Sequence, residues 1–185
     1  MKTFLQSLRL LAGLTLLCGG LYPLTVWAVG QLFFHHAAEG SVLTQDDHVV
    51  GSALLAQKTT DPRYFSPRPS AGDYATVASG ASNLAWTSAK LRDAVAANEK
   101  DFRTQNQLTE ATPIPADLTT TSGSGLDPDL SPEAVRLQIP RVASARHLAP
   151  EKISALINRR IETSLFGPTR INVLQLNLLL DQLHD

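Results

Sequence analysis

The sequence predicts an α+β domain that follows a single N-terminal membrane-spanning helix. Residues 10–30 contain no charged side chain and are strongly apolar. At about 1.5 Å per helical residue, this run spans a bilayer core of about 30 Å. About 155 residues follow, enough for one globular domain with its own core. Within them, segments with helical periodicity are interspersed with short β-prone stretches, and this mixture is typical of the α+β class.

The charges around the apolar run predict its orientation. Lys2 and Arg9 precede it, and no Lys or Arg follows until Lys58. The positive-inside rule then places the N-terminus in the cytoplasm and the remaining chain outside. The predicted divisions are a cytoplasmic N-terminus at residues 1–9, an anchor helix at 10–34 and an extracytoplasmic domain at 35–185.

A cleaved secretory signal is the competing interpretation of the same residues. Ala28-Val29-Gly30 offers the small side chains that signal cleavage needs. The apolar run is longer than a usual signal core, however, and it carries Trp27 and bulky aliphatic residues up to that point. These features favour a retained anchor.

One face of the anchor carries small or kink-forming residues at spacings of three and four, namely Ala12, Thr15, Gly19 and Pro23. Small residues let a second helix approach closely, and close packing drives helix association in lipid. The face therefore predicts docking to other membrane subunits. The alternative is that Gly and Pro are simply frequent in membrane helices. In either case we expect Pro23 to kink the helix.

Composition excludes several classes of function. The domain after the anchor holds 14 of the 16 basic residues and all 17 acidic residues, so its net charge is close to −3. This balance gives no electrostatic footprint for nucleic acid. The single cysteine, Cys18, lies in the anchor, so the domain has neither a disulfide nor a cysteine ligand for a metal.

The first half of the domain is predicted to hold one strand or strand pair, one long loop and one surface helix. Residues 49–56 are β-prone and are interrupted by Gly51. Residues 57–83 are irregular, because prolines and glycines break any regular pattern. Residues 87–107 have helical periodicity, with Thr87 or Ser88 as N-cap. The predicted core face of this helix comprises Leu91, Ala94, Val95 and Phe102.

Further helices are predicted in the second half. Ser131 is placed to cap a helix that starts at Pro132, and Pro140 divides this segment in two. Another helix opens at Pro150 and runs to about Leu165. Its predicted core face comprises Ile153, Leu156, Ile157 and Ile161.

Two more stretches are predicted as strands. Residues 117–121 are rich in β-prone threonine. Residues 170–177 alternate partly between apolar and polar side chains, with Ile171 and Val173 expected to be buried. A short terminal helix is expected over residues 178–183.

Candidate ligand sites are few. The Ser122-Gly123-Ser124-Gly125 run could present backbone N–H groups to an anion, but no Lys follows it, and a structural turn is the favoured interpretation. Asp127 and Asp129 could hold a cation, although aspartates at a loop tip more often form turns. No metal or cofactor is predicted to bind this chain.

Enzymatic signatures are also absent from the sequence, which contains neither a phosphate-binding loop nor a Gly-x-Ser-x-Gly elbow. A hydrolase built on Ser124 and Asp127 lacks a base. His147 is the only histidine well inside the domain, whereas His48 and His184 lie near its ends.

The arginines are interpreted in two ways. Arg68 stands in an aromatic, proline-rich loop and is expected to be fixed there by stacking, as an internal staple. The others are interpreted as a solvated or lipid-facing surface, and they are Arg136, Arg141, Arg146, Arg159 and Arg160.

Five blocks together resemble the C subunit of the Kdp potassium-transporting ATPase. They are YFSPRPSA at 64–71, SGASNL at 79–84, TSGSGLDPDLSP at 121–132, QIPRVASAR at 138–146 and NVLQLN at 172–177. They occur in that family's order behind one membrane helix and span essentially the whole chain. The loop positions singled out by this resemblance are Arg68, Ser70, Ser82, Asn83, Ser122, Gly123, Ser124, Gly125 and Asp127.

The resemblance implies a non-catalytic, single-pass subunit of a bacterial inner-membrane complex that uses ATP, Mg and potassium. In that complex a channel-like subunit selects potassium, a P-type ATPase subunit hydrolyses ATP, and a small membrane subunit is also present. This chain lacks the Asp-Lys-Thr-Gly-Thr phosphorylation motif and a second membrane span. It is expected to contact membrane lipid, pack its helix on the channel-like subunit, support assembly and shape ion access at the outer mouth.

Two alternative roles come with the resemblance. The first is a catalytic chaperone that raises ATP affinity or binds nucleotide, for which the loop at 122–125 is the candidate. The predicted topology opposes direct binding, because ATP is cytoplasmic and the domain is placed outside. The second alternative is an assembly chaperone that leaves the mature pump.

Overall fold

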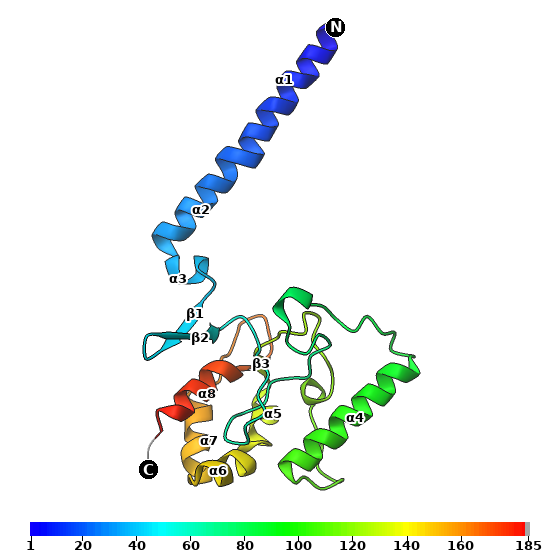
Figure 1. Ribbon diagram of the computed structural model, residues 1–185, viewed down its shortest axis with the longest axis vertical. Coiled ribbons are helices and arrows are strands. Elements are labelled where there is room, and N and C mark those ends of the chain that lie inside the picture. Colours follow the sequence, from blue (N-terminus) through cyan, green and yellow to red (C-terminus); the bar gives the residue numbers. More distant parts are fainter. Residues whose placement is uncertain (184–185) are drawn as a thin grey trace. The chain divides into compact units, whose positions relative to one another are not determined.

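The computed structural model describes residues 1–183 and divides the chain into two units, Met1–Val42 and Leu43–Asp185 (Figure 1). The first unit consists mainly of one long helix. The described part of the second unit combines five α-helices with two two-stranded sheets. This mixture of helices and strands agrees with the predicted α+β class.

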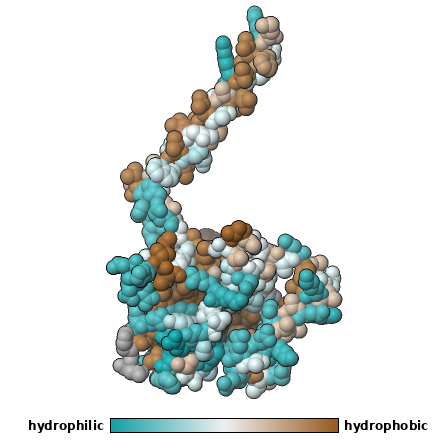
Figure 2. Space-filling view, in the orientation of Figure 1, coloured by the Kyte–Doolittle hydropathy of each residue, from teal (hydrophilic) through white to brown (hydrophobic). Residues whose placement is uncertain are grey.

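The long helix of the first unit covers Lys2–Phe33 and is long and apolar enough to cross a membrane. It consists of α1 (Lys2–Leu16), a π-helical turn (Leu17–Leu21) and α2 (Tyr22–Phe33). None of its residues is buried, and Figure 2 shows apolar side chains along much of its length. The helix needs an apolar environment that the chain itself does not supply.

The π-helical turn lies directly before Pro23, where a kink was predicted. Proline has no N–H group, so it cannot donate to the carbonyl of Gly19 one turn earlier. The turn widens instead, and the Tyr22 N–H donates to the carbonyl of Leu17. A short helix, α3 (His35–Ala38), follows the long helix.

A β-hairpin begins the second unit. Strands β1 (Val42–Gln45) and β2 (His48–Ser52) pair in a two-stranded sheet. Asp46 and Asp47 form the two-residue loop, with φ of 50° and 62°, a conformation that aspartate tolerates better than most residues. β1 was not predicted, and the strand predicted over 49–56 ends earlier, at Ser52.

The apolar core of the second unit lies between four helices of its C-terminal half, and side chains from the loops also pack into it. The helices are α5 (Pro132–Arg136), α6 (Ile139–Arg146), α7 (Pro150–Asn158) and α8 (Val173–Asp181). Phe65 from the irregular segment is completely buried in this core. A fully buried side chain of this size contributes about 1.5–3 kcal/mol, so the loop is part of the folded body and not an appendage.

The predictions for the first helices are largely confirmed. Helix α4 (Ala89–Asn106) follows Ser88, and of its predicted core face only Phe102 is fully buried. Ser131 caps α5, its hydroxyl accepting a hydrogen bond from the Ala134 N–H at 3.2 Å. The division near Pro140 is also confirmed, since α5 ends at Arg136 and α6 begins at Ile139.

The end predicted for the next helix was wrong. Helix α7 ends at Asn158, seven residues before Leu165. The chain then forms a loop that is closed by a β-bridge between Glu162 and Arg170. Pairing across this loop replaces the helical hydrogen bonds that the apolar periodicity had suggested.

Two strand predictions were also wrong. Residues 117–121 overlap a 3₁₀ turn at Ala116–Leu118. Of residues 170–177, only β4 (Ile171–Asn172) is a strand, and it pairs antiparallel with β3 (Asp129–Leu130). Helix α8 then starts at Val173, five residues before the predicted 178, because the Asn172 side chain caps it by accepting from the Gln175 N–H at 3.0 Å.

Candidate functional site

The segment that contains Tyr64, Phe65 and Ser66 is held in the domain by two buried amide side chains. The Phe65 N–H donates to Asn177 Oδ1 at 2.8 Å, and Asn177 Nδ2 donates to the Phe65 carbonyl at 2.9 Å. Gln138 does the same for Ser66, at 2.8 and 3.1 Å. Each amide therefore replaces a neighbouring β-strand, and the buried backbone stays paired.

Arg141 fixes the same segment from α6. Its guanidinium donates to the carbonyls of Pro62 and Tyr64 at 2.8 and 2.9 Å, and to Gln138 Oε1 at 2.8 Å. Its Nε donates to Asn106 Oδ1 at 2.9 Å. Burial lowers the pKa of Arg141 from its ordinary value. The prediction that Arg141 faces solvent or lipid was wrong, because its donors are used inside the domain.

Arg146 was also wrongly predicted to be a surface residue. It donates to the carbonyls of Arg63 and Leu180 at 2.7 and 3.1 Å and pairs with Asp181 at 2.6 Å. Its guanidinium lies 4.7 Å from the centre of the Tyr64 ring. Burial and a hydrogen bond to Asp181 raise the pKa of the Tyr64 hydroxyl. The stacked arginine is thus Arg146, and the stacking predicted for Arg68 is not what fixes Arg68.

Arg68 joins two of the family loops through an ion pair. Its Nη1 donates to Asp127 Oδ2 at 2.8 Å. The Tyr74 hydroxyl donates to the Arg68 carbonyl at 2.8 Å, and burial raises the pKa of Tyr74 to about 12. Asp127 also accepts from the Asp129 N–H at 3.1 Å, which is a turn-forming contact. Asp127 is therefore engaged in the fold, and Asp129 faces Arg170 at 3.4 Å.

The glycine-rich loop packs against the loop of residues 79–80. Gly125 has φ +68°, and a Cβ there would lie 3.0 Å from the Gly80 carbonyl and 3.2 Å from Ser70 Oγ. The Gly80 N–H donates to the Ser124 carbonyl at 2.9 Å. The N–H groups of Gly125 and Leu126 donate to Ser122 O and Ser124 Oγ within the loop. These amides are occupied, so this geometry favours the structural turn over an anion site.

Two family positions stand apart from this network. Ser82 and Asn83 are exposed, and their side chains make no hydrogen bond to other residues in 1–183. The remaining singled-out loop residues, Arg68, Ser70, Ser122, Gly123, Ser124, Gly125 and Asp127, lie together where the segments of residues 68–74, 79–80 and 120–129 meet. The blocks that are distant in the chain thus converge on a scaffold of internal hydrogen bonds.

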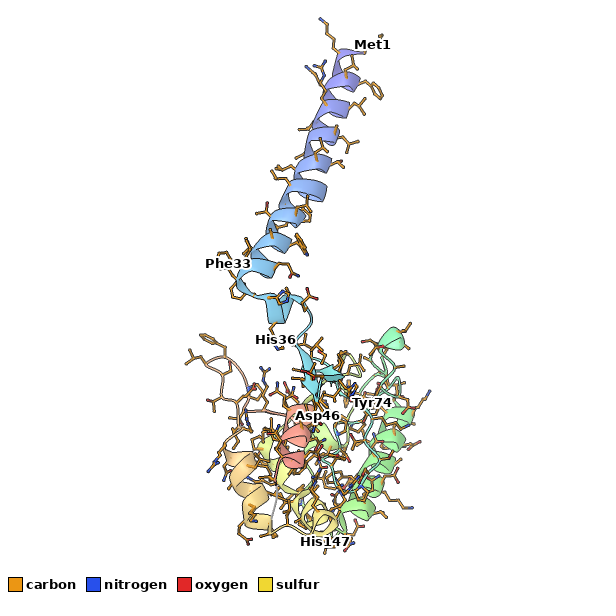
Figure 3. The ribbon with its side chains drawn as sticks, turned by 60° about the vertical axis from the view of Figure 1, so that its left-hand side comes forward. Met1, Phe33, His36, Asp46, Tyr74 and His147 are labelled. Atoms are coloured by element: carbon orange, nitrogen blue, oxygen red, sulfur yellow. The ribbon has the colours of Figure 1, made fainter. Side chains whose placement is uncertain are left out.

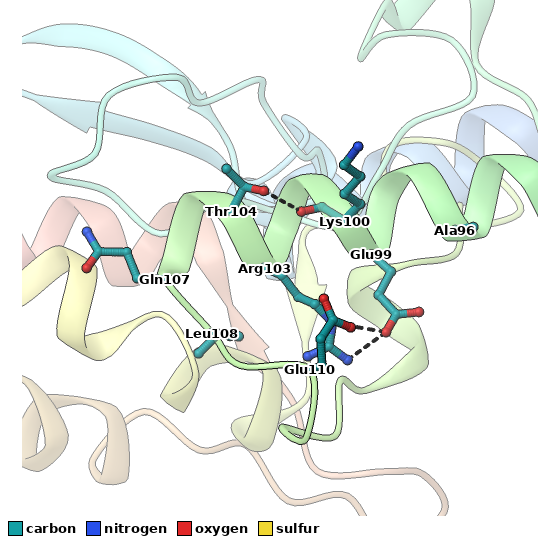
Figure 4. Close-up of a pocket in the computed structure, with 8 residues that line it drawn as sticks. All are labelled: Ala96, Glu99, Lys100, Arg103, Thr104, Gln107, Leu108 and Glu110. Atoms are coloured by element: carbon teal, nitrogen blue, oxygen red, sulfur yellow. Dashed lines mark hydrogen bonds and ion pairs between the residues drawn. The ribbon is translucent and has the colours of Figure 1, made fainter.

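The hollow along α4 is lined in part by side chains that already have partners. It has a volume of about 590 Å³, and Figure 4 shows residues that line it. Arg103 in its wall pairs with Glu99 at 2.6 Å and donates to the carbonyls of Thr109 and Thr112 at 2.5 and 2.9 Å. Within residues 1–183 no group of three or more His, Cys, Asp or Glu is placed to hold a metal. His184, one of the histidines weighed for a hydrolase, lies outside the described residues.

A family model for the c chain of the K+-transporting ATPase, KdpC, matches residues 4–182. The chain belongs to the KdpC family. The resemblance drawn from the five sequence blocks is confirmed. As a KdpC chain, it is a subunit of a potassium-transporting ATPase and not an enzyme by itself.

Curated relatives match along nearly the whole chain. The chain is 47% identical over 183 residues to a potassium-transporting ATPase KdpC subunit of Serratia proteamaculans, covering 96% of each protein. It is 43% identical over 187 residues to the subunit of that name from Mycobacterium tuberculosis, covering 98% of this chain and 99% of the relative. The corresponding protein of Shewanella putrefaciens is 42% identical over 181 residues, with coverage of 96% and 90%.

Sequence reasoning missed the buried amides Gln138 and Asn177 that organise the network. A signal for Asn177 existed, because it falls among Val173, Leu176 and Leu180 at helical spacing. A polar side chain on an apolar helix face requires a buried partner. No comparable periodicity marks Gln138, which lies in the break between α5 and α6.

Proposed function

We propose that this chain is the accessory subunit that anchors to the channel-like subunit of the pump, stabilises the complex and shapes potassium access at its outer mouth. The observation that carries the proposal is the helix Lys2–Phe33, of which no residue is buried within the chain. Such a helix is stable only when lipid or other membrane helices cover it. We place the chain in the inner membrane with its domain outside, and the flanking charges support this orientation.

The small-residue face of the helix is the proposed contact with the channel-like subunit. A Cβ built at Gly19 meets no atom within 4 Å, so nothing in the chain occupies the space beside it. Ala12 and Thr15 extend the same face, and Pro23 continues it beyond the π-helical turn. Close approach of a second helix along this face would gain the van der Waals contacts that hold helices together in lipid.

The domain has the properties of a rigid scaffold with a surface for another protein. Its loops are fixed by the internal network, whereas residues 74–89 carry no charged side chain. Val77 and Trp86 in this segment are 102% and 90% exposed. Interface cores are depleted in charge and enriched in aromatic residues, so this segment is the proposed contact of the domain with the channel-like subunit. The mildly acidic domain would favour cations at an outer entrance.

Thiol labelling tests the topology on which the proposal depends. Single cysteines replace Ser144, which is exposed on α6 and lies outside the proposed contact, and Ser7, which is exposed at the start of the helix, in a Cys18→Ser chain. We expect an impermeant reagent to label Ser144→Cys in intact cells and Ser7→Cys only after lysis. The reverse pattern would place the domain in the cytoplasm and restore the nucleotide alternative.

Co-purification tests the helix contact. Gly19→Leu is expected to reduce recovery of the channel-like subunit, because the larger side chain separates the helices. Gly13→Leu is the matched control, since Gly13 is equally open but lies on another face. Equal recovery with both variants would refute the proposed face. Absence of the wild-type chain from the mature, active pump would instead support the assembly-chaperone alternative.

A further inference from the structure

An exposed arm projects from the domain between α7 and α8. Its base is closed by the bridge in which the Glu162 N–H donates to the Arg170 carbonyl at 2.9 Å and the Arg170 N–H donates back at 3.1 Å. At its tip, Leu165 and Phe166 are 94% and 98% exposed. Figure 3 shows this loop extending away from the helices. We propose that the arm, residues 159–170, binds anionic phospholipid at the surface of the membrane in which the chain is anchored.

The tip of the arm suits the interfacial region of a bilayer. Residues 163–169 carry no charge, and both large side chains at the tip lack contact with the core. Transfer of such side chains from water into the acyl boundary is favourable and approximately proportional to their apolar area. The bridge at the base fixes the loop ends in advance, so less ordering is required on binding.

The base of the arm supplies positive charge. Arg159 and Arg160 are exposed, and neither guanidinium has a hydrogen-bond or ion-pair partner within residues 1–183. Arg170 pairs with Glu162 at 3.2 Å and with Asp129 at 3.4 Å, so the three arginines at the base still outnumber the two carboxylates. A hollow of about 120 Å³ lies here, lined in part by Arg159, Arg160 and the amide side chains of Asn172 and Gln175. The two guanidinium groups and the Gln175 amide suit a phosphate group, and the apolar tip beside them suits acyl chains. The Asn172 amide is already used, because its Nδ2 donates to the Ala53 carbonyl at 2.7 Å.

The short linker keeps the start of the domain close to the end of the apolar helix. Only nine residues, 34–42, separate the end of the apolar helix at Phe33 from the domain that starts at Leu43. At no more than about 3.5 Å per residue, they span about 30 Å at most. Tethering at such a distance raises the effective concentration of lipid at the arm, so even a weak contact is populated.

The arm differs in charge from residues 74–89, the proposed contact with the channel-like subunit. Residues 74–89 expose apolar side chains without charge, as interface cores do. The arm instead combines an apolar tip with unpaired arginines, the pattern of a segment that lies on an anionic membrane surface. The two surfaces therefore fit partners of different chemistry.

Fluorescence of the full chain in vesicles tests the inference. In a Cys18→Ser background, Phe166→Cys is labelled with a small environment-sensitive fluorophore. Vesicles contain phosphatidylcholine alone or equal parts of phosphatidylcholine and phosphatidylglycerol. We expect quenching by acyl-chain doxyl lipid at position 166 in the anionic vesicles. Val77→Cys, equally exposed in the same domain, is the matched control and is expected to stay unquenched.

Replacement of the two arginines is the second part of the experiment. Each arginine near an anionic surface contributes a factor of about five to association, so Arg159→Gln with Arg160→Gln should lower it about 25-fold. Arg92→Gln, an exposed arginine of α4, is expected to have no effect. Equal quenching at positions 166 and 77 would overturn the inference. So would quenching at position 166 that changes neither with the phosphatidylglycerol content nor with replacement of the two arginines.

Flotation distinguishes this failure from failure of the proposed anchor. A chain that does not float with the vesicles after an alkaline wash lacks a membrane-spanning helix, which refutes both ideas. A chain that floats but leaves position 166 in water refutes the lipid contact alone. Shielding of position 166 only in the assembled pump would assign the arm to a protein partner and also overturn the inference.

Discussion

Replacing Asn177 by Leu removes the two hydrogen bonds that hold Phe65 in the core. The N–H and carbonyl of Phe65 are paired with the Asn177 amide at 2.8 and 2.9 Å, and Phe65 is completely buried. Leucine has the same branched shape, although it is somewhat larger, and it has no polar atom, so both backbone groups would be left buried without a partner. Each unsatisfied group costs about 1–3 kcal/mol, and the added apolar burial offsets part of this. We expect a loss of about 3 kcal/mol in the free energy of unfolding.

Thermal unfolding of the full chain in detergent micelles, followed by circular dichroism, measures this loss. For a domain of this size, about 3 °C per kcal/mol gives a fall in Tm of about 10 °C. Asn158→Leu is the matched control, because Asn158 is exposed at the end of α7, and it should change the stability by less than about 0.5 kcal/mol. A loss below about 1 kcal/mol for Asn177→Leu would refute the reasoning that this amide substitutes for a β-strand.

Three further predictions concern backbone conformation and ionisation. Gly125→Ala should lower the free energy of unfolding by about 1–3 kcal/mol, because alanine is strained at φ +68° and its Cβ meets the Gly80 carbonyl. Gly123→Ala is the control. A Cβ there meets open space, so the free energy of unfolding measured by chemical denaturation should change by less than about 0.5 kcal/mol. His147→Gly should raise the free energy of unfolding by about 0.5–1 kcal/mol in the same assay, because His147 ends α6 at φ 56°, a conformation that glycine adopts more easily. A lower free energy of unfolding would show that the His147 side chain contributes to stability. The raised pKa of Tyr74, about 12, predicts stability that is complete below pH of about 10, the unfolded pKa, and is lost as pH rises through about 12. Unfolding at successive pH values should show a larger loss in the wild type than in Tyr74→Phe, in which Tyr64 still titrates with a raised pKa.

The internal network gives a physical reason why distant blocks of the chain share one scaffold. Gln138 binds Ser66 and also accepts from Arg141 at 2.8 Å, while Asn177 binds the adjacent Phe65. Residues that fix one segment are energetically coupled, because release of the segment removes all of its contacts together. The irregular loop thereby behaves as a structural element although it contains almost no regular secondary structure.

The sequence by itself determined the long apolar helix, the family and the starts of α5 and α7. The ability of an uncharged apolar run to span a membrane depends only on its own length and composition, so it can be predicted without tertiary information. Ser131 with Pro132 and the proline at 150 likewise mark helix starts through local sterics and capping. The family resemblance singled out Arg68 and Asp127, but only the structure shows that their loops converge.

Only the tertiary structure decided the helix ends, the short strands and the roles of the arginines. Gln107 and His147 end α4 and α6 in the left-handed region, where glycine would have been the usual signal. β4 and the early start of α8 depend on pairing with β3 and on the Asn172 cap. Arg141 and Arg146 look like surface residues in the sequence, yet their partners are up to 79 and 83 positions away. Hydrogen bonds between such distant residues exist only after the chain has packed, and no local pattern encodes them.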